Sequence, residues 1–259
     1  MSLPIWTPDA LRSEARPFEG TAWRLVEAQH RVSTLKLVDT LREQDVLESI
    51  LDETKPPVPP ECRHLDYLLS TPFRYRPYPN GSRFRRAGVT PGVWYGAERP
   101  ETAAAEMVFY RLFLFYAESP ETPFPDDAAE YTAFSVDLSS PVALDLTAGA
   151  LAQDAAHWRH PTDYEQCQSL ADAAREIGVE VIRYASVRDP EKGANVAVLT
   201  CRAFANPAPV ERQTWRIRIS RTGAQAVREH PRLGVEFPPD TFADDPRIAL
   251  MVWDRPRAR

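Results

Sequence analysis

The residue with the clearest chemical potential in this sequence is Glu106, a lone carboxylate in an apolar segment. Alanines, leucines and aromatic residues surround it from Pro100 to Phe115 and leave hardly a polar face. Such a segment is typical of a buried helix. No lysine or arginine stands three or four places from Glu106 to pair with it along that helix. Because an unpaired buried carboxylate is costly, we expect either a ligand-binding role or an ion pair with an arginine from elsewhere in the chain.

A tyrosine and two arginines precede Glu106. Tyr95 lies in the apolar stretch 92–96, which predicts a short buried strand ending at a glycine turn. A strand followed directly by a helix would let Tyr95 and Glu106 face one cleft. Arg74 and Arg83 are expected on preceding strands, where a guanidinium can bind a phosphate or carboxylate through two hydrogen bonds. The set offers an arginine for an anion, a tyrosine for a flat ring and a carboxylate for a developing positive charge.

The net charge and the local clustering of arginines indicate which class of ligand the protein binds. The 259 residues carry a formal charge of −6, which argues against binding nucleic acid over a broad surface. Arginines nevertheless cluster locally, and this favours a pocket for a phosphorylated small molecule, although a solvated strand face would explain any single one of them. The cluster consists of Arg74, Arg76, Arg83, Arg85 and Arg86.

Several other site types lack their sequence signatures. The three cysteines are widely spaced, which indicates neither a zinc site nor a disulfide framework, and no H-E-x-x-H is present. We therefore expect no metal. Neither a Rossmann nor a P-loop glycine pattern occurs. The sequence also contains no apolar run of about 18 residues and no signal peptide, so we expect a cytoplasmic protein without membrane contact.

The chain is expected to divide into residues 1–61 and residues 62–259. The first part reads as a helical extension, since Thr40 and Glu43 form a capping box that opens an amphipathic helix. Within this part, residues 23–26 are either a short strand or the start of a helix. A proline-rich strap, residues 56–60, then leads to the main domain. The apolar stripe of the helix consists of Val46, Leu47, Ile50 and Leu51.

The main domain, residues 62–259, mixes helices and short strands without regular alternation. This favours an α+β fold with a mixed, mainly antiparallel central sheet and flanking helices. One helix is expected to end at Gly178, and Ser186 lies at the exit of the strand that follows, where it is either a free hydroxyl or a turn former. The expected strands cover residues 131–138, 142–146, 179–188, 195–201 and 215–219.

Four sequence blocks together resemble the RES domain, a family named for its arginine, glutamate and serine. The resemblance covers roughly residues 65–205. Its blocks are Arg83 within Gly-Ser-Arg-Phe, Tyr95 within Val-Trp-Tyr-Gly, Glu106 after Glu-Thr-Ala-Ala-Ala, and Ser186 within Tyr-Ala-Ser-Val-Arg.

The resemblance implies a growth-inhibiting toxin of a bacterial toxin–antitoxin pair. Its fold would be similar to the core of ADP-ribosylating toxins, and it would consume NAD. Its partner would be an Xre-like DNA-binding antitoxin whose C-terminal part covers the active site. The family further implies a hetero-oligomer in which antitoxin dimers bridge a toxin dimer.

The resemblance also implies a role for each site residue. Arg74 or Arg83 would hold the NAD pyrophosphate, with Tyr75 beside the former, and Tyr95 would pack on the nicotinamide or its ribose. Glu106 would stabilise the oxocarbenium as nicotinamide leaves, and Ser186 would hydrogen-bond the nicotinamide side. For the first family arginine, Arg24 and Arg31 are alternatives to Arg74.

The sequence leaves three functions open. ADP-ribose would be transferred to a host protein, for which the family suggests ribose-phosphate pyrophosphokinase, or it would pass to water or phosphate and deplete NAD. The third alternative is a non-catalytic partner that uses the same surface only to bind its DNA-binding regulator. Residues 1–61 form a segment long enough to contact a protein acceptor, which favours transfer of ADP-ribose to a protein.

Overall fold

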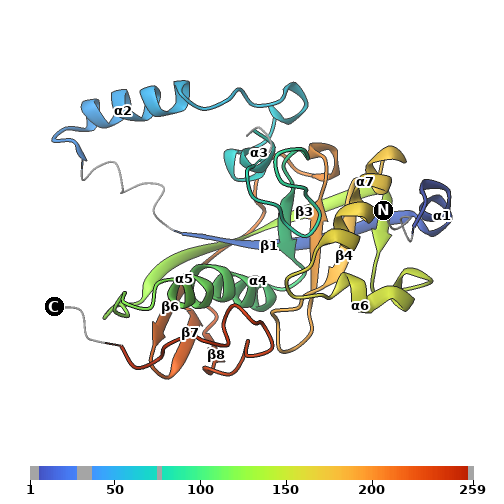
Figure 1. Cartoon of the computed structure of the whole chain (residues 1–259). Coiled ribbons are helices and arrows are strands. Elements are labelled where there is room, and N and C mark those ends of the chain that lie inside the picture. The colour runs from blue at the N-terminus through green and yellow to red at the C-terminus, as the bar shows by residue number, and fades with distance from the viewer. Residues whose placement is uncertain (1–5, 28–36, 75–77, 256–259) are drawn as a thin grey trace.

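The computed structural model describes residues 6–27, 37–74 and 78–255, which are built around an eight-stranded sheet (Figure 1). The strand order is β1-β2-β5-β4-β3-β6-β7-β8, and the strand pairs are antiparallel except for the parallel pair β3 and β4. The predicted α+β fold with a mixed, mainly antiparallel sheet is therefore confirmed. The strands are β1 (Arg16–Glu27), β2 (Trp94–Ala97), β3 (Ala129–Asp145), β4 (Val181–Ala185), β5 (Ala194–Val198), β6 (Arg212–Ser220), β7 (Gly223–Arg228) and β8 (Leu233–Phe237).

Strand β1 closes part of the sheet on itself. It pairs with β2 at Trp23 and Ala97, and it pairs with β3 from Arg16 to Glu27. The strands β1, β2, β5, β4 and β3 therefore form a ring. As a consequence, a segment near the N-terminus lies beside β2 and the helix that follows β2.

Helices cover the sheet in three groups, each with its own core cluster. The helices α4 (Pro100–Met107) and α5 (Leu114–Glu118) pack with β6, β7 and β8, while α1 (Pro8–Glu14), α6 (Ala155–Trp158) and α7 (Glu165–Glu176) form a second cluster. A third cluster holds α3 (Tyr67–Arg74) and the short helices η3 (Pro60–Cys62) and η6 (Cys201–Ala203). A further short helix is η5 (Leu151–Asp154).

The apolar segment around Glu106 forms the expected helix. Pro100 occupies its first turn after Arg99, which has an extended backbone. The helix continues through a π-helical turn, η4 (Val108–Phe113), into α5. Its alanines and Phe109 are buried, whereas Tyr110 and Phe115 are about half exposed.

Residues 16–27, which lie in the part expected as a helical extension, form strand β1, so of the two alternatives for residues 23–26 the strand is the one found. The strand buries Ala22 in one core cluster and Trp23 and Leu25 in another, so both of its faces are covered. Burial of both faces favours a strand here, where the local sequence pattern is compatible with either a strand or a helix. The central sheet thus begins before residue 62, and the expectation of a helical extension fits only α2 (Leu41–Glu53) and its short flanks.

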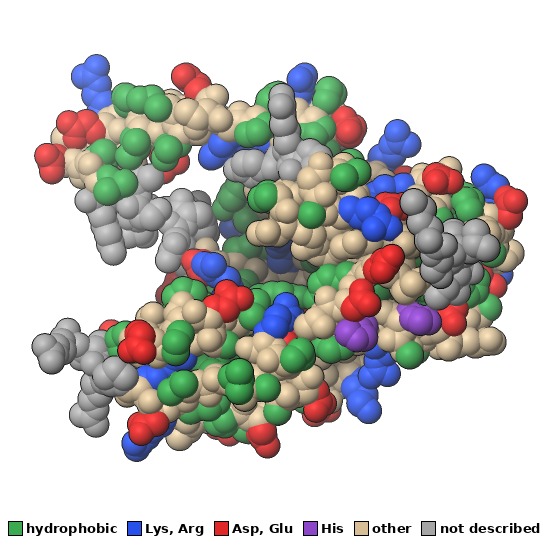
Figure 2. Space-filling model, in the orientation of Figure 1, with side chains coloured by type: hydrophobic (Ala, Val, Ile, Leu, Met, Phe, Trp, Pro, Cys, Tyr) green, Lys and Arg blue, Asp and Glu red, His purple; other side chains and the backbone are tan. Residues whose placement is uncertain are grey.

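Helix α2 begins at the predicted capping box. The amide of Glu43 donates to Thr40 Oγ1 at 3.2 Å, and the amide of Thr40 donates to a Glu43 carboxylate oxygen at 3.1 Å. The helix stands apart from the sheet (Figure 1), and the space-filling view shows apolar side chains on its surface (Figure 2). Its exposed apolar residues are Leu41, Val46, Ile50 and Leu51.

Three further expectations need correction. The segment 67–74 was expected to lead into a strand, but it forms α3, whose start is capped by the Asp66 carboxylate accepting from the Leu68 amide at 2.8 Å. The strands expected at 131–138 and 142–146 are one continuous strand, β3. No disulfide was expected, but Cys62 and Cys201 form one, with their Cα atoms 5.5 Å apart, because η3 and η6 pack together.

Some features do match the sequence prediction closely. Gly178 follows α7 with φ of +77°, the left-handed conformation expected at that helix end. Strand β6 alternates between buried and exposed side chains. Among the described residues, no helix combines the length and the apolar character needed to cross a bilayer.

Candidate functional site

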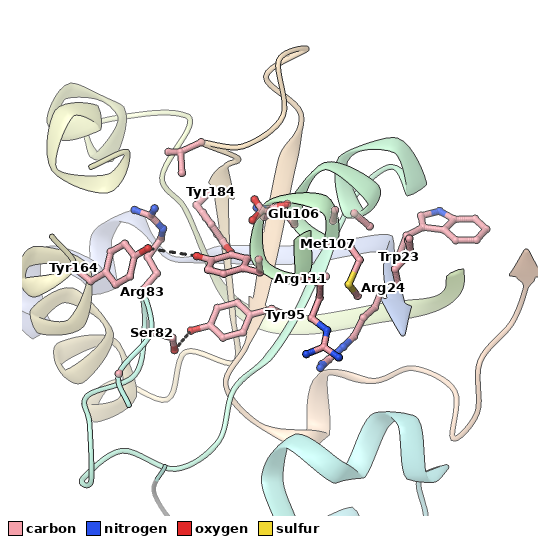
Figure 3. A pocket seen from close by; sticks show the side chains of 18 of the residues that line it. Trp23, Arg24, Ser82, Arg83, Tyr95, Glu106, Met107, Arg111, Tyr164 and Tyr184 are labelled. Atoms are coloured by element: carbon pink, nitrogen blue, oxygen red, sulfur yellow. Dashed lines mark hydrogen bonds between the residues drawn. The ribbon is translucent and has the colours of Figure 1, made fainter. Parts of the chain in front are cut away.

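A cavity of about 420 Å³ opens beside α4, between the N-terminal part of the sheet and the turn η4 (Figure 3). Strands β1 and β2, helix α4 and the loop before β2 each contribute side chains. Glu106, Tyr95 and Arg83 all line it, so three residues predicted from separate sequence blocks share one cavity. The other polar or charged lining residues are Arg24, Ser82, Tyr110, Arg111, Tyr164, Tyr184, Asn195 and Arg247.

Neutral hydrogen-bond donors hold Glu106 in this cavity. Its Oε1 accepts from Ser186 Oγ at 2.7 Å and from Asn195 Nδ2 at 2.6 Å. No arginine or lysine of the described residues forms an ion pair with it. The structural ion pair considered as an alternative is therefore not found in this part of the chain. The carboxylate is therefore available to a ligand that enters the cavity.

Ser186 is fixed by the loop that follows β4. Its Oγ accepts from the amides of Arg188 and Asp189 at 3.1 and 3.0 Å, so its own hydrogen is directed to Glu106. Asp189 secures this loop, since its carboxylate accepts from Thr102 Oγ1 at 2.6 Å and pairs with Arg99 at 3.0 Å. The serine is therefore both a turn former and a donor to the carboxylate.

Tyr95 connects strand β2 to the loop that carries Arg83. Its hydroxyl lies 2.8 Å from Ser82 Oγ and accepts from the Phe84 amide at 3.2 Å. Burial raises the pKa of Tyr95, which keeps the phenol protonated at neutral pH. The tyrosine thus presents an uncharged ring to the cavity.

Arg83 lies in a loop rather than on the expected strand, and its side chain is buried. Its guanidinium donates to the Trp158 carbonyl at 2.6 Å and lies 4.7 Å from the centre of the Tyr164 ring. A cation on an aromatic face is attracted by the ring quadrupole. Arg83 therefore sets the position of Tyr164 at one end of the cavity (Figure 3).

Arg74 does not line the cavity, whereas Arg83, the other predicted arginine, does. It ends helix α3, and its Nε donates to the Pro56 carbonyl of the proline-rich strap. Tyr75 and Arg31 lie outside the described residues. Of the two candidates for the first family arginine that the structure describes, Arg24 lines the cavity and Arg74 does not.

Arg24 projects from β1 into the cavity, at the side where Arg111 also points (Figure 3). Its guanidinium lies 5.7 Å from the centre of the Trp94 ring, and no described residue accepts a hydrogen bond from it. Burial lowers the pKa of Arg24 to about 10, which leaves it charged at neutral pH. A charged guanidinium without an acceptor is the group here best suited to bind an anion.

Sequence reasoning missed several lining residues. Asn195, which donates to Glu106, had no sequence feature beyond its place at the start of an expected strand. Arg111 was also missed, and its Nε donates to Glu27 at 2.7 Å. Tyr110 and Tyr164 have their hydroxyl oxygens 3.4 Å apart. Although Tyr110 as a whole is about half exposed, desolvation of its hydroxyl raises its pKa. Among the described residues, no group of three or more His, Cys, Asp or Glu side chains is placed to hold a metal ion.

The fold and the cavity define an α+β protein whose basic, tyrosine-lined pocket surrounds one carboxylate. The model of the RES domain matches residues 58–220. The chain belongs to the RES domain family, which confirms the resemblance seen in its sequence. No curated protein matches the chain. A solved structure, the MbcT–MbcA toxin–antitoxin complex of M. tuberculosis, is similar at 13% identity over 79% of this chain and 89% of that one, with a TM-score of 0.46.

Proposed function

We propose that this protein is the toxin of a bacterial toxin–antitoxin pair and that it cleaves NAD at the bond between nicotinamide and ribose. The observation that carries the proposal is Glu106, held by Ser186 and Asn195 without a cationic partner among the described residues. A carboxylate in this state can stabilise a positive charge that develops beside it. Membership of the RES domain family supports this reaction.

The reaction requires little acid–base catalysis from the protein. The nicotinamide of NAD is already cationic, so the electron pair of the breaking bond neutralises its ring nitrogen and positive charge moves to the ribose. Glu106 would stabilise that charge, while Ser186 and Asn195 fix the orientation of its carboxylate. Positioning and electrostatic stabilisation would thus supply most of the rate enhancement.

We propose Arg24, in place of Arg74, as the residue that binds the diphosphate of NAD. The support is its place in the cavity, the absence of a hydrogen-bond acceptor among the described residues, and the neighbouring guanidinium of Arg111. Tyr95 offers its ring to the nicotinamide or its ribose. Arg83 would act mainly through Tyr164, because Trp158 and Tyr164 already occupy its guanidinium.

For the fate of ADP-ribose we propose transfer to a host protein, with ribose-phosphate pyrophosphokinase as the target that the family suggests. The second candidate is transfer to water or phosphate. Helix α2 and the proline-rich strap favour a protein acceptor, because they form an arm apart from the sheet that carries exposed apolar side chains (Figure 2). These side chains would bury against a protein surface but not against a small acceptor.

We further propose that an Xre-like antitoxin neutralises the toxin by covering the cavity, in the bacterial cytoplasm. A non-catalytic protein that only binds its regulator is the remaining alternative. Thermal unfolding separates the two proposals, because a specific ligand raises the melting temperature even when it binds weakly. No shift with millimolar NAD would favour the non-catalytic alternative.

The experiment that tests the proposed function uses the purified chain without antitoxin and NAD labelled on its adenylate. Nicotinamide release is followed with and without bacterial extract. Label on one protein band would establish transfer and identify the target. Release without labelled protein would establish hydrolysis or phosphorolysis, and no release would reject the proposed reaction.

A further inference from the structure

The C-terminal segment that follows β8 returns to the cavity. The family match ends at residue 220, yet Arg247 lines the cavity together with Tyr110 and Tyr164. Phe242 anchors this segment, since its ring packs against Phe109 and Phe113 in the turn next to Glu106, with ring centres 5.3 and 4.7 Å apart. The cavity is therefore completed by a segment outside the matched family region.

A buried carboxylate fixes Arg247. Asp245 is 1% exposed and accepts from Arg247 Nε at 2.9 Å and from Arg247 Nη2 at 2.7 Å. This arrangement holds the guanidinium plane through two parallel hydrogen bonds. The third nitrogen, Nη1, has no hydrogen-bond acceptor among the described residues. The side chain is thus pre-positioned with one donor group available.

Asp245 compensates only one of two positive charges. It also pairs with Arg188 at 2.8 Å, and Arg188 is almost fully buried. Both guanidiniums lie against the ring of Phe109, 3.8 Å away for Arg188 and 5.2 Å for Arg247. Two cations with one carboxylate leave a net charge of about +1, with Arg188 and Asp245 buried and Arg247 partly exposed. Of the two, Arg247 is the one that reaches the cavity.

The position of Arg247 places this charge at the end of the cavity away from Arg24. Arg247 and Tyr164 both donate to the Pro161 carbonyl, at 3.3 and 3.0 Å, and Arg83 lies on the Tyr164 ring. Arg24 and Arg111 point into the cavity on the other side of Glu106 (Figure 3). The cavity therefore has positive charge on both sides of its carboxylate.

We infer that Arg247 is an anion-binding residue of this pocket and that Asp245 is the residue that positions it. The inference rests on the proposed function and extends the active site to the C-terminal segment. The anionic oxygens that Arg247 binds belong to the nucleotide or to orthophosphate that acts as the acceptor. A charge-assisted hydrogen bond of this kind is worth about tenfold or more in affinity.

The test compares Arg247→Ala, Arg247→Lys and Asp245→Asn with Arg255→Ala. Arg255 is a matched control, since it lies in the same segment and also packs on aromatic rings, those of Tyr116 and Phe124, but it does not line the cavity. Calorimetry measures the affinity for ADP-ribose and for nicotinamide. Kinetics measures the KM for NAD and the dependence of the rate on added orthophosphate. Melting temperatures identify any variant that does not fold.

If the nucleotide carries the anion, we expect Arg247→Ala to weaken ADP-ribose binding about tenfold and to leave nicotinamide binding unchanged. If the acceptor carries it, the dependence on orthophosphate should be lost at unchanged ADP-ribose affinity. Arg247→Lys should recover part of either effect, and Arg255→Ala should show neither. Unchanged binding and unchanged phosphate dependence in Arg247→Ala, or equal losses in Arg255→Ala, would overturn the inference.

The same data separate this inference from the proposed reaction. Wild-type protein that binds ADP-ribose through Arg247 but releases no nicotinamide from NAD would reject the reaction and retain the anion-binding role. Wild-type protein that releases no nicotinamide and does not bind ADP-ribose would reject both. Asp245→Asn should reproduce the Arg247→Ala effect on binding if it folds, since its role is to hold that guanidinium.

Discussion

Ser186 and Glu106 are joined by a hydrogen bond of 2.7 Å, although they lie 80 residues apart in the sequence. Asn195 donates to the same carboxylate oxygen from a neighbouring strand. Both donors are neutral, so they orient the carboxylate without compensating its charge. The other oxygen of Glu106 accepts no hydrogen bond from the described residues and can face a substrate.

Removing either donor should lower the rate of NAD cleavage more than the affinity for NAD. We expect Ser186→Ala and Asn195→Ala each to reduce kcat about tenfold, because each removes one hydrogen bond to a charged group. Residues that act as one unit are not additive, so the double variant should lose less than the product of the two effects. Steady-state kinetics checks this.

The control for these variants is Ser139→Ala, an exposed serine on β3. It should leave the kinetics unchanged. A Ser186→Ala protein as active as this control would contradict the role of the hydrogen bond to Glu106.

The choice between Arg24 and Arg74 can be tested directly. Arg24→Ala should raise the Kd for NAD by about tenfold or more, because its guanidinium has no acceptor among the described residues. Arg74→Ala should change the Kd little, since Arg74 binds the proline-rich strap. Calorimetric titration with NAD measures both. The reverse result would restore Arg74 as the diphosphate residue.

The sequence predicted the fold class and the shared cavity of Arg83, Tyr95 and Glu106, because a strand, a turn and a helix in direct succession fix the last two locally. It did not decide between Arg24 and Arg74. That choice depends on the pairing of β1 with β3, which is set by burial on both faces of β1 rather than by local pattern. Asn195 and Arg247 were missed for the same reason, since tertiary packing alone brings them to Glu106 and Tyr164.

Alkaline pH should destabilise the protein through its buried tyrosines. Burial raises the pKa of Tyr184 well above the ordinary value, so the folded state holds this proton more tightly than the unfolded chain. The contribution is fully present below pH of about 10 and is lost as the pH rises above it. Tyr184→Phe removes the titrating group.

The free energy of unfolding, measured by urea titration from pH 8 to 11, checks this. It should fall more steeply above pH of about 10 for the wild type than for Tyr184→Phe, by up to about 1.4 kcal/mol per pH unit. Parallel curves for the two proteins would show that Tyr184 titrates normally.

The disulfide between Cys62 and Cys201 should contribute to stability, because it connects η3 to η6 across 139 residues of sequence. Reduction should lower the free energy of unfolding by roughly 3–5 kcal/mol. The third cysteine, Cys167, is buried and free, so thiol titration of the denatured protein should find one thiol before reduction and three after. Three thiols before reduction would contradict the disulfide.

The central claim is that Glu106 stabilises the charge that forms when nicotinamide leaves, and nicotinamide release by Glu106→Gln tests it most directly. The matched control is Glu101→Gln, which changes a carboxylate one turn earlier in the same helix that pairs with Arg228 instead. We expect Glu106→Gln to lower the rate by about 10²–10³, with its melting temperature and NAD affinity retained, and Glu101→Gln to match the wild type. A Glu106→Gln protein that releases nicotinamide at the wild-type rate would contradict the account.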